Sequence, residues 1–390
     1  MSHNSSTDQQ VTVEQPQSTN LNDQLLEELL ASSATGSTNT TPKNAIVAAE
    51  RIRKQNYARL VAYQNVTSYS MQQTLHRCPR EFQLSKLKAQ AELEGDFQED
   101  IFYKERAEEE MPLHFSFGHA VGAGIATYDQ TRDLDKAIFS AFLAWTSPLL
   151  AEQDMSAPRT RRKLEEFHHA IQAIKLYPQF VDFETDLHEY EVVHLEANVA
   201  IDFEDGRFYV GHIDELLRHK ESGKLRVKEN KTSGYASPDP ALFSNSEQTI
   251  SYSALIQAHG QQEYEVEYSV YSKPEQRWIR MLFPKSDNSR VEWLKDQLIL
   301  NRTLDDCESA NFFPKRGSGC VRFGGRRCRW YEECDMTASS LFGREFSDLP
   351  VAKDLAELNE IEEHQYSITL TQLKRKLKEA NEQQQSSSIP

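Results

Sequence analysis

The alternation of apolar and polar residues predicts a β-sheet in the middle of the chain. Several segments alternate with a period of two, which is typical of half-buried strands. The sequence Glu-Ser-Gly-Lys at 221–224 has turn-forming residues and predicts a hairpin between two of them. The strand-like segments are 190–201, 208–218, 225–231, 264–272 and 277–284.

Between and beyond these segments, apolar residues recur with the period of a helix. At 70–84, for example, Met71, Leu75 and Phe82 share one helical face with Cys78. The other predicted helices cover 117–128, 164–174, 247–258, 291–306 and 370–381. Helices that flank a central mixed sheet make an α/β core, which is the fold class that we expect.

Composition separates the two ends of the chain from its middle. Residues 1–43 are rich in Ser, Thr, Gln and Asn, which predicts disorder, except for a short leucine-bearing helix at 21–30. We expect a folded domain over 44–340 that closes with a cysteine-rich segment at 307–336. Residues 341–390 are predicted to form a helical, partly disordered tail.

Charge alone does not decide what the chain binds. Its formal net charge of −16 argues against nucleic acid, because a phosphate backbone repels an acidic surface. Residues 315–329, however, contain six basic residues and no acidic one, and form either a local DNA-binding groove or an ordinary solvated face. The sequence has neither a run of eighteen apolar residues nor a secretory signal, so we expect a cytoplasmic protein that does not span a membrane.

The most informative stretch joins two neighbouring strands. Gly-His-Ile-Asp ends at Asp214, and after fourteen intervening residues come Glu229, Asn230 and Lys231. Because side chains two apart point to the same face of a strand, Glu229 and Lys231 point together, and the hairpin brings Asp214 to the same place. Two carboxylates at one point suit Mg²⁺ or Mn²⁺, and a lysine beside them can orient water for the hydrolysis of a phosphodiester.

Taken alone, this triplet is more often a cross-strand ion pair than a catalytic site. Further along the chain, Gln248 and Tyr252 are four residues apart and lie on the same face of a predicted helix. A lone pair of this kind is by default a polar pair on a helix surface. The order in which the aspartate motif, the Glu-Asn-Lys triplet and the Gln/Tyr pair follow one another along the chain favours a catalytic site instead.

In that order, Gly-His-Ile-Asp, Glu-Asn-Lys-Thr and Gln-x-x-x-Tyr resemble the RecB-type branch of the PD-(D/E)XK nucleases. Two upstream segments, 68–82 with Cys-Pro-Arg-Glu-Phe and 117–120 with Phe-Gly-His-Ala, resemble the helical motifs of that family. The resemblance covers roughly residues 66–336. It implies a restriction-endonuclease-like core in which Asp214 and Glu229 bind the metal and Lys231 assists the water. Gln248 and Tyr252 would then shape the DNA side of the site.

The sequence departs from this family at one position. Members often carry a metal-binding histidine four residues after the motif glycine, where this chain has Gly122. His119 and Glu196 are the candidates for the missing metal ligand, and Glu191 is a weaker one. His119 can equally be a helix histidine with a structural hydrogen bond.

The cysteines suggest a second inorganic site. Cys78 stands far upstream of three others near the C-terminal end, and this arrangement resembles iron–sulfur members of the superfamily such as the AddB-type nucleases. The resemblance implies a [4Fe–4S] cluster held by Cys78, Cys320, Cys328 and Cys334. Zinc and unligated thiols remain alternatives, and Cys307 fits no ligand position.

The resemblance implies a metal-dependent DNA nuclease, specifically an exonuclease of phage or bacterial recombination and repair. The N-terminal tail would then dock on a recombination or replication protein. The alternative is a DNA-binding or assembly module of the same fold that is weakly active or inactive, and Gly122 is the observation that favours it.

Overall fold

A computed structural model describes residues 55–95, 113–151, 157–244, 246–257, 259–260, 265–321 and 327–387. The predicted disordered tail over 1–43, with its short helix at 21–30, lies outside these residues. The strands are β1 (Val66–Ser68), β2 (Tyr190–Asp202), β3 (Phe208–His219), β4 (Leu225–Ser233), β5 (Glu265–Ser272), β6 (Arg277–Pro284) and β7 (Tyr366–Thr369). The α-helices are α3 (Tyr69–Arg77), α4 (Pro79–Glu94), α6 (Leu113–Thr131), α7 (Leu134–Ala151), α8 (Ala157–Glu184), α9 (Ala241–Ser244), α10 (Glu247–Ile256), α11 (Asp287–Ser309), α12 (Ala338–Phe342), α13 (Leu355–Asn359) and α14 (Leu370–Ser387).

The seven strands form one mixed sheet in the order β6-β5-β4-β3-β2-β7, and β1 pairs with β3. The pairs β2–β3, β3–β4 and β5–β6 are antiparallel, whereas β4–β5, β2–β7 and β1–β3 are parallel. The predicted hairpin between β3 and β4 is present, with Gly223 at φ 70° in its turn. The α/β class and the mixed sheet are therefore confirmed.

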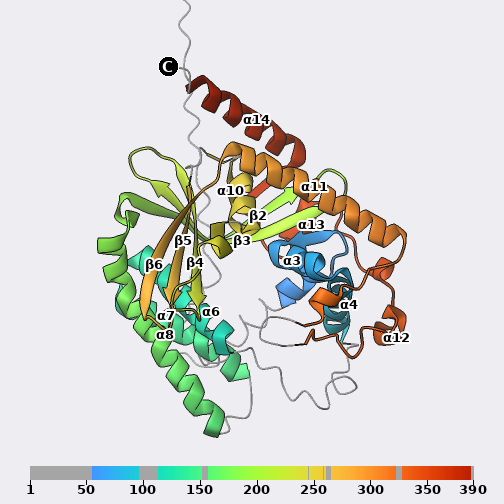
Figure 1. Cartoon of the computed structure of the whole chain (residues 1–390), viewed down its shortest axis with the longest axis horizontal. Helices are drawn as coiled ribbons and strands as arrows, with labels where there is room; N and C mark the ends of the chain where they lie inside the picture. The colour runs from blue at the N-terminus through green and yellow to red at the C-terminus, as the bar shows by residue number, and fades with distance from the viewer. Residues whose placement is uncertain are drawn as a thin grey trace, which may run out of the picture.

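Helices cover the sheet on both sides (Figure 1). On one side, side chains of α10, α11 and α14 pack against apolar residues of β2, β3, β4 and β5 in the largest buried cluster. On the other side, α6, α7 and α8 bury a second cluster that contains Leu217 of β3 and Trp278 of β6. Helices therefore cover both faces of the sheet at the central strands β3, β4 and β5. Polar side chains buried there need hydrogen-bond partners within the protein.

The predicted helix at 70–84 is wrong in one respect, because two helices meet at Cys78. The backbone of Cys78 is extended (φ −160°, ψ 106°) and Pro79 is the first residue of α4. Proline lacks an N–H and disfavours helical geometry in the residue before it, so the first helix ends there. Two short strands, β1 and β7, and the helix α7 were not predicted.

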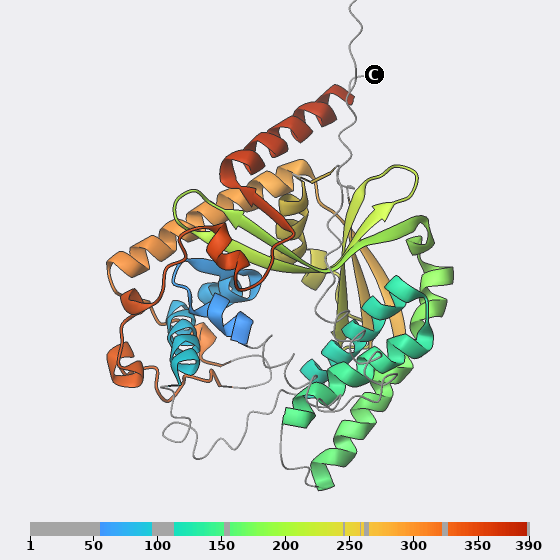
Figure 2. The same cartoon turned by 180° about the vertical axis from the view of Figure 1, so that it is seen from behind.

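The chain between position 340 and the end of α14 contributes to the folded body. Residues of β7 pair with β2, and Leu373 and Leu377 of α14 belong to the largest core cluster. Helix α14 extends beyond the predicted helix at 370–381 and ends at Ser387. Viewed from behind, the orange-red segment that precedes α14 lies beside the blue segments near the start of the described chain (Figure 2).

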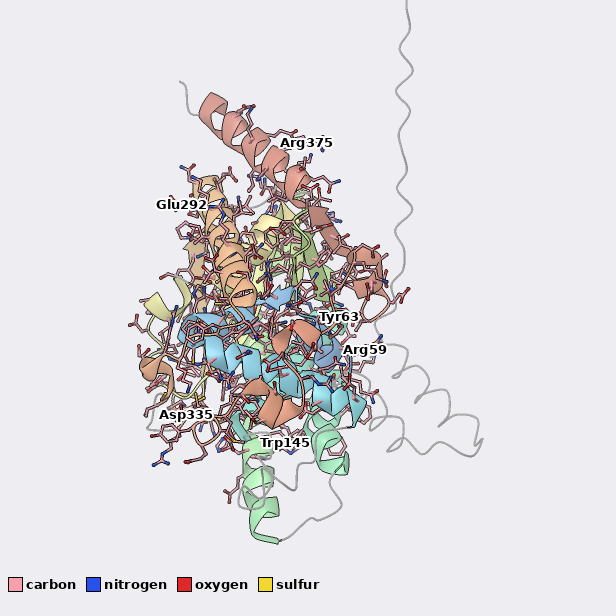
Figure 3. All side chains as sticks on the ribbon, turned by 90° about the vertical axis from the view of Figure 1, so that its right-hand side faces the viewer. Arg59, Tyr63, Trp145, Glu292, Asp335 and Arg375 are labelled. Atoms are coloured by element: carbon pink, nitrogen blue, oxygen red, sulfur yellow. The ribbon has the colours of Figure 1, made fainter. Side chains whose placement is uncertain are left out.

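The α14 helix with Arg375 and the α7 helix with Trp145 mark opposite ends of the molecule (Figure 3). None of the helices in the described part of the chain has both the length and the apolar character that crossing a bilayer requires.

Candidate active site

The candidate site begins where strands β3 and β4 separate. Their antiparallel pairing ends at Glu215 opposite Lys228. Two residues further along β4, the backbone N–H of Asn230 donates to Asp214 Oδ2 at 2.8 Å. The Asp214 carboxylate therefore takes the place that a backbone carbonyl of β3 would have in a continued ladder. This opening between two hydrogen-bonded strands holds the predicted acidic residues.

Glu229 and Lys231 meet at this opening, as the alternation along β4 predicts. Lys231 Nζ lies 2.7 Å from Glu229 Oε2, and Glu229 is fully buried. Its other oxygen, Oε1, is buried and has no hydrogen-bond partner within the described residues. The site therefore contains an acceptor that is directed to a group other than Lys231.

The two carboxylates affect each other's protonation. Burial and the neighbouring Asp214 carboxylate raise the pKa of Glu229 to about 8. Burial also raises the pKa of Asp214, although the charge of Lys231 opposes the shift. Although burial lowers it, the two carboxylates raise the pKa of Lys231 above its ordinary value. Two acidic groups that repel each other in a desolvated place are suited to share a cation.

Gln248 and Tyr252 of α10 also reach this region. Gln248 Nε2 donates to Tyr252 Oη at 3.4 Å, and the same oxygen accepts the backbone N–H of His212 at 3.3 Å. The Tyr252 ring lies over Gly211: a Cβ built at Gly211 would stand 2.5 Å from Tyr252 Cε1. The glycine of the Gly-His-Ile-Asp motif is therefore required by the close approach of α10 to β3.

We expect Gly211→Ala to destabilise the protein by about 1–3 kcal/mol, because the added methyl group must displace the Tyr252 ring. A urea titration followed by circular dichroism measures this change in the free energy of unfolding. The matched control is Gly122→Ala in helix α6, where a Cβ would meet no described residue within 4 Å. Alanine there should be neutral or stabilising, because glycine inside a helix costs roughly 0.5–1 kcal/mol. Equal stability of Gly211→Ala and the parent protein would show that the ring moves away freely.

Glu196 stands in β2 beside Asp214. Its neighbours Leu195 and Ala197 pair with Glu215 and Ile213, so Glu196 is opposite Asp214 in the register. Glu196 has φ 51°, in the left-handed region that non-glycine residues rarely adopt. Such backbone strain persists only where the surroundings impose it, and it is frequent at functional sites.

The Glu196 carboxylate contacts a residue that the sequence analysis gave no role. Glu196 Oε2 and His212 Nε2 are 2.6 Å apart, and both side chains are partly exposed. Although burial alone would lower it, the hydrogen bond and charge of Glu196 raise the pKa of His212 to about 9. A histidine two residues before a candidate metal ligand, on the same strand, is the only sequence signal that would have indicated this pair.

The other two candidates for the missing ligand are less favourably placed. His119 follows Gly118 on α6 and its side chain is exposed. Gly118 itself lies against β4, since its Cβ position would be 3.4 Å from Thr232 Oγ1. Glu191, near the start of β2, is exposed and pairs with Arg218 at 3.0 Å. At Gly122 a Cβ atom would meet no atom of the described residues within 4 Å.

The structure brings the predicted cysteine ligands into one region. Gly319, the neighbour of Cys320, is so close to Cys78 that its own Cβ would stand 3.0 Å from Cys78 Cβ. The backbone N–H of Cys328 donates to the Cys320 carbonyl at 2.8 Å. Burial raises the pKa of Cys334, and the nearby thiols of Cys78 and Cys320 add to the shift. Cys307 is buried on α11, in an apolar cluster with Phe313.

Within the described ranges, no three His, Cys, Asp or Glu side chains are arranged to hold a metal ion. The structure thus brings together Asp214, Glu229, Lys231, Gln248 and Tyr252, which the sequence analysis selected. Glu196 is near them but is turned to His212.

Comparison with protein families agrees with this geometry. Residues 66–335 match the family model described as the PD-(D/E)XK nuclease superfamily. No curated protein sequence matches the chain. A solved structure described as "Crystal structure of SSO0001" is 15% identical, covers 55% of this chain and 84% of its own, and superposes with a TM-score of 0.22. Because the family match spans most of the chain and includes the opening between β3 and β4, the chain belongs to the PD-(D/E)XK nuclease superfamily.

Proposed function

We propose that the chain is a DNA nuclease that hydrolyses phosphodiester bonds with Mg²⁺ or Mn²⁺, and that it acts as an exonuclease in recombination or repair. The observation that carries the proposal is the meeting of Asp214, Glu229 and Lys231 where β3 and β4 separate, within the segment that matches the nuclease family. The phage or bacterial setting rests on the resemblance of the motifs to RecB-type nucleases.

The residues present fit a hard divalent cation. Glu229 Oε1 is a buried acceptor without a partner in the described part of the chain, and Asp214 is close enough to raise the pKa of Glu229. Carboxylate oxygens are the ligands that Mg²⁺ and Mn²⁺ prefer. Asp214 and Glu229 would hold the ion, which when bound lowers the pKa of a neighbouring water and offsets the negative charge of the phosphate.

The remaining residues of the site have separate tasks. Lys231 keeps its positive charge because its pKa is raised, so it can donate hydrogen bonds to the attacking water or to a phosphate oxygen. Tyr252 Oη, which accepts from Gln248 and from the backbone of His212, is held in a fixed position beside β3. We assign Gln248 and Tyr252 to the DNA side of the site.

Digestion of end-labelled linear DNA and of a closed circle, each with Mg²⁺ or Mn²⁺, tests this function. An exonuclease releases the end label and leaves the circle intact, whereas an endonuclease opens the circle. Protein with Glu229→Gln, purified in the same way, controls for contaminating nucleases. Binding of DNA without cleavage of either substrate would contradict the proposal and favour the inactive DNA-binding module that Gly122 suggests.

We propose Glu196 as the third metal ligand, because it is opposite Asp214 and its backbone is strained. A carboxylate is also a better partner for Mg²⁺ than the imidazole of His119. Glu196 would have to leave His212 in order to bind the ion. Mn²⁺ should bind more weakly to Glu196→Gln than to His119→Ala, and equal affinities would count against Glu196.

We also propose that Cys78, Cys320, Cys328 and Cys334 hold a [4Fe–4S] cluster. The proposal is supported by the contact of the 319–320 segment with Cys78 and by the effect of Cys78 and Cys320 on the pKa of Cys334. A cluster here would attach the segment after α11 to the start of α4, and its binding energy would stabilise the fold.

Protein purified without oxygen is therefore expected to be brown and to contain about four iron atoms per chain. Cys78→Ser should remove the colour and most of the iron, because one of the four thiolates is lost. Cys307→Ser is the matched control, since Cys307 is also a buried thiol but lies on α11. Colourless protein with stoichiometric zinc, or without metal, would contradict the cluster.

A further inference from the structure

We infer that Asn230, the residue between Glu229 and Lys231, is a positioning residue that fixes the Asp214 carboxylate for metal binding. The inference rests on the proposed function, because it assigns Asp214 to the metal. Its basis is a buried polar network of Asp129, Tyr177, Glu215 and Lys228, to which the Asn230 side chain is attached.

The network is centred on a fully buried ammonium group. Lys228 Nζ donates to Asp129 Oδ2 at 2.9 Å, to Tyr177 Oη at 2.6 Å and to Glu215 Oε1 at 2.7 Å. The Tyr177 hydroxyl donates in turn to Asp129 Oδ2 at 2.7 Å. All three hydrogens of the ammonium are therefore used, and the four side chains are at most 4% exposed. Glu215 accepts through Oε1 only, because its Oε2 is buried and has no partner among the described residues. The ammonium group of Lys228 is fully paired and shielded from water, and this holds the network in place, because another position would leave a buried charge unpaired.

Asn230 connects this network to the candidate site. Its Nδ2 donates to Glu215 Oε1 at 2.5 Å, and its backbone N–H donates to Asp214 Oδ2 at 2.8 Å. Within the described residues Asn230 Oδ1 has no partner, so the contact with Glu215 alone fixes the amide. The two hydrogen bonds leave the same residue in different directions, one into the network and one to Asp214.

Alternation along β4 explains why one residue can serve both purposes. Lys228 and Asn230 direct their side chains to the network, whereas Glu229 and Lys231 direct theirs to the opposite face of the sheet. The strand is not paired with β3 at Asn230, so no ladder bond fixes its backbone on that side. On the other side, β4 is paired with β5, and Asn230 is opposite Ser269. The side-chain anchor on Glu215 therefore adds to this ladder in fixing the direction of the Asn230 N–H.

The network also connects helix α6 to the candidate site. Asp129 comes from α6, the helix that carries Gly118 and lies against Thr232 of β4. A shift of α6 along β4 would therefore be transmitted through Lys228, Glu215 and Asn230 to the Asp214 carboxylate. Groups that orient metal ligands in this way commonly change metal affinity by 10- to 100-fold when they are removed.

The test is the affinity for Mn²⁺, measured by electron paramagnetic resonance in the absence of DNA, so that it does not depend on catalysis. Asn230→Ala is expected to weaken Mn²⁺ binding by about tenfold. The matched control is Asn65→Ala: Asn65 is also buried and hydrogen-bonded, but to Gly206 and Ala352. Asn65→Ala should lower the melting temperature at least as much and leave the Mn²⁺ affinity unchanged.

Asn230→Ser provides a second variant if Asn230→Ala does not fold, since serine is too short to reach Glu215 but stays polar. Parental Mn²⁺ affinity in either folded variant would overturn the inference and leave Asn230 with a structural role only. If the parent protein itself binds no Mn²⁺, the proposed function fails, and this outcome is distinct from a failure of Asn230 alone. An equal loss of Mn²⁺ affinity in Asn65→Ala would also overturn the inference about Asn230, because the loss would then come from general destabilisation.

Discussion

Glu229→Gln is expected to abolish measurable Mn²⁺ binding and to lower the rate of DNA cleavage by about 10³-fold or more. The charge stabilisation that a bound metal supplies is worth several kcal/mol, and each 1.36 kcal/mol is a factor of ten in rate. The substitution keeps the volume of the side chain. Burial and Asp214 already raise the pKa of Glu229 to about 8, so a neutral amide should be tolerated by the metal-free fold.

Glu267→Gln is the matched control for this experiment. Glu267 is also fully buried, pairs with Arg226 at 3.1 Å, and has one oxygen without a partner among the described residues. It lies in β5, one strand from the site. The control should lose stability but retain Mn²⁺ binding and cleavage. Isothermal titration measures Mn²⁺ binding and DNA digestion measures cleavage in both variants. Parental Mn²⁺ binding and cleavage by Glu229→Gln would exclude Glu229 as a metal ligand.

Lys231→Ala is expected to reduce cleavage by about 10²–10³-fold while it spares metal binding. The loss corresponds to the removal of one fixed electrostatic donor from a reacting centre. Lys231 is not a ligand: its Nζ is 2.7 Å from Glu229 Oε2 and leaves Oε1 to another partner. The rate under saturating Mn²⁺ and the Mn²⁺ dissociation constant together separate the two effects.

Lys273→Ala is a suitable control for Lys231→Ala, because the two lysines are alike in their surroundings. Their side chains are 32% and 34% exposed, and each pairs with a glutamate, Glu229 for Lys231 and Glu166 for Lys273. Lys273 lies just beyond the end of β5. Its replacement should leave the cleavage rate near that of the parent. A comparable loss in both variants would mean that general positive charge, and not the position of Lys231, supports cleavage.

The central sheet could be predicted from sequence because its signals are local. The segments that form β2, β3 and β4 were predicted from apolar–polar alternation in the sequence, although each strand has several consecutive buried residues in the structure. Glu-Ser-Gly-Lys has the residues of a hairpin turn. That hairpin was enough to bring Asp214 next to Glu229 and Lys231. The break between α3 and α4 at Cys78 was missed although Pro79 signals it, because an unbroken apolar periodicity was given more weight than the proline.

The rest of the site depends on contacts that no local pattern contains. The alternation along a strand implies that Asn230 points away from Glu229 and Lys231, and its side chain does so, but its backbone N–H donates to Asp214. The ion pair of Glu196 with His212 joins residues of two strands and requires an unusual backbone at Glu196. These features follow from the register of β2 on β3 and from the position of α6. Neither can be predicted from a local pattern in a single sequence.

The pairing of β7 with β2 has a consequence for how the chain folds as it is made. Asn198 and Gln365, which are hydrogen-bonded beside these strands, are 167 residues apart. At roughly 5–20 residues per second, a ribosome needs about ten to thirty seconds to synthesise that length. During this interval β2 has an open edge, and exposed edges invite pairing with other chains. Nascent chains that end before β7 are therefore expected to be the species most prone to aggregation and most dependent on chaperones.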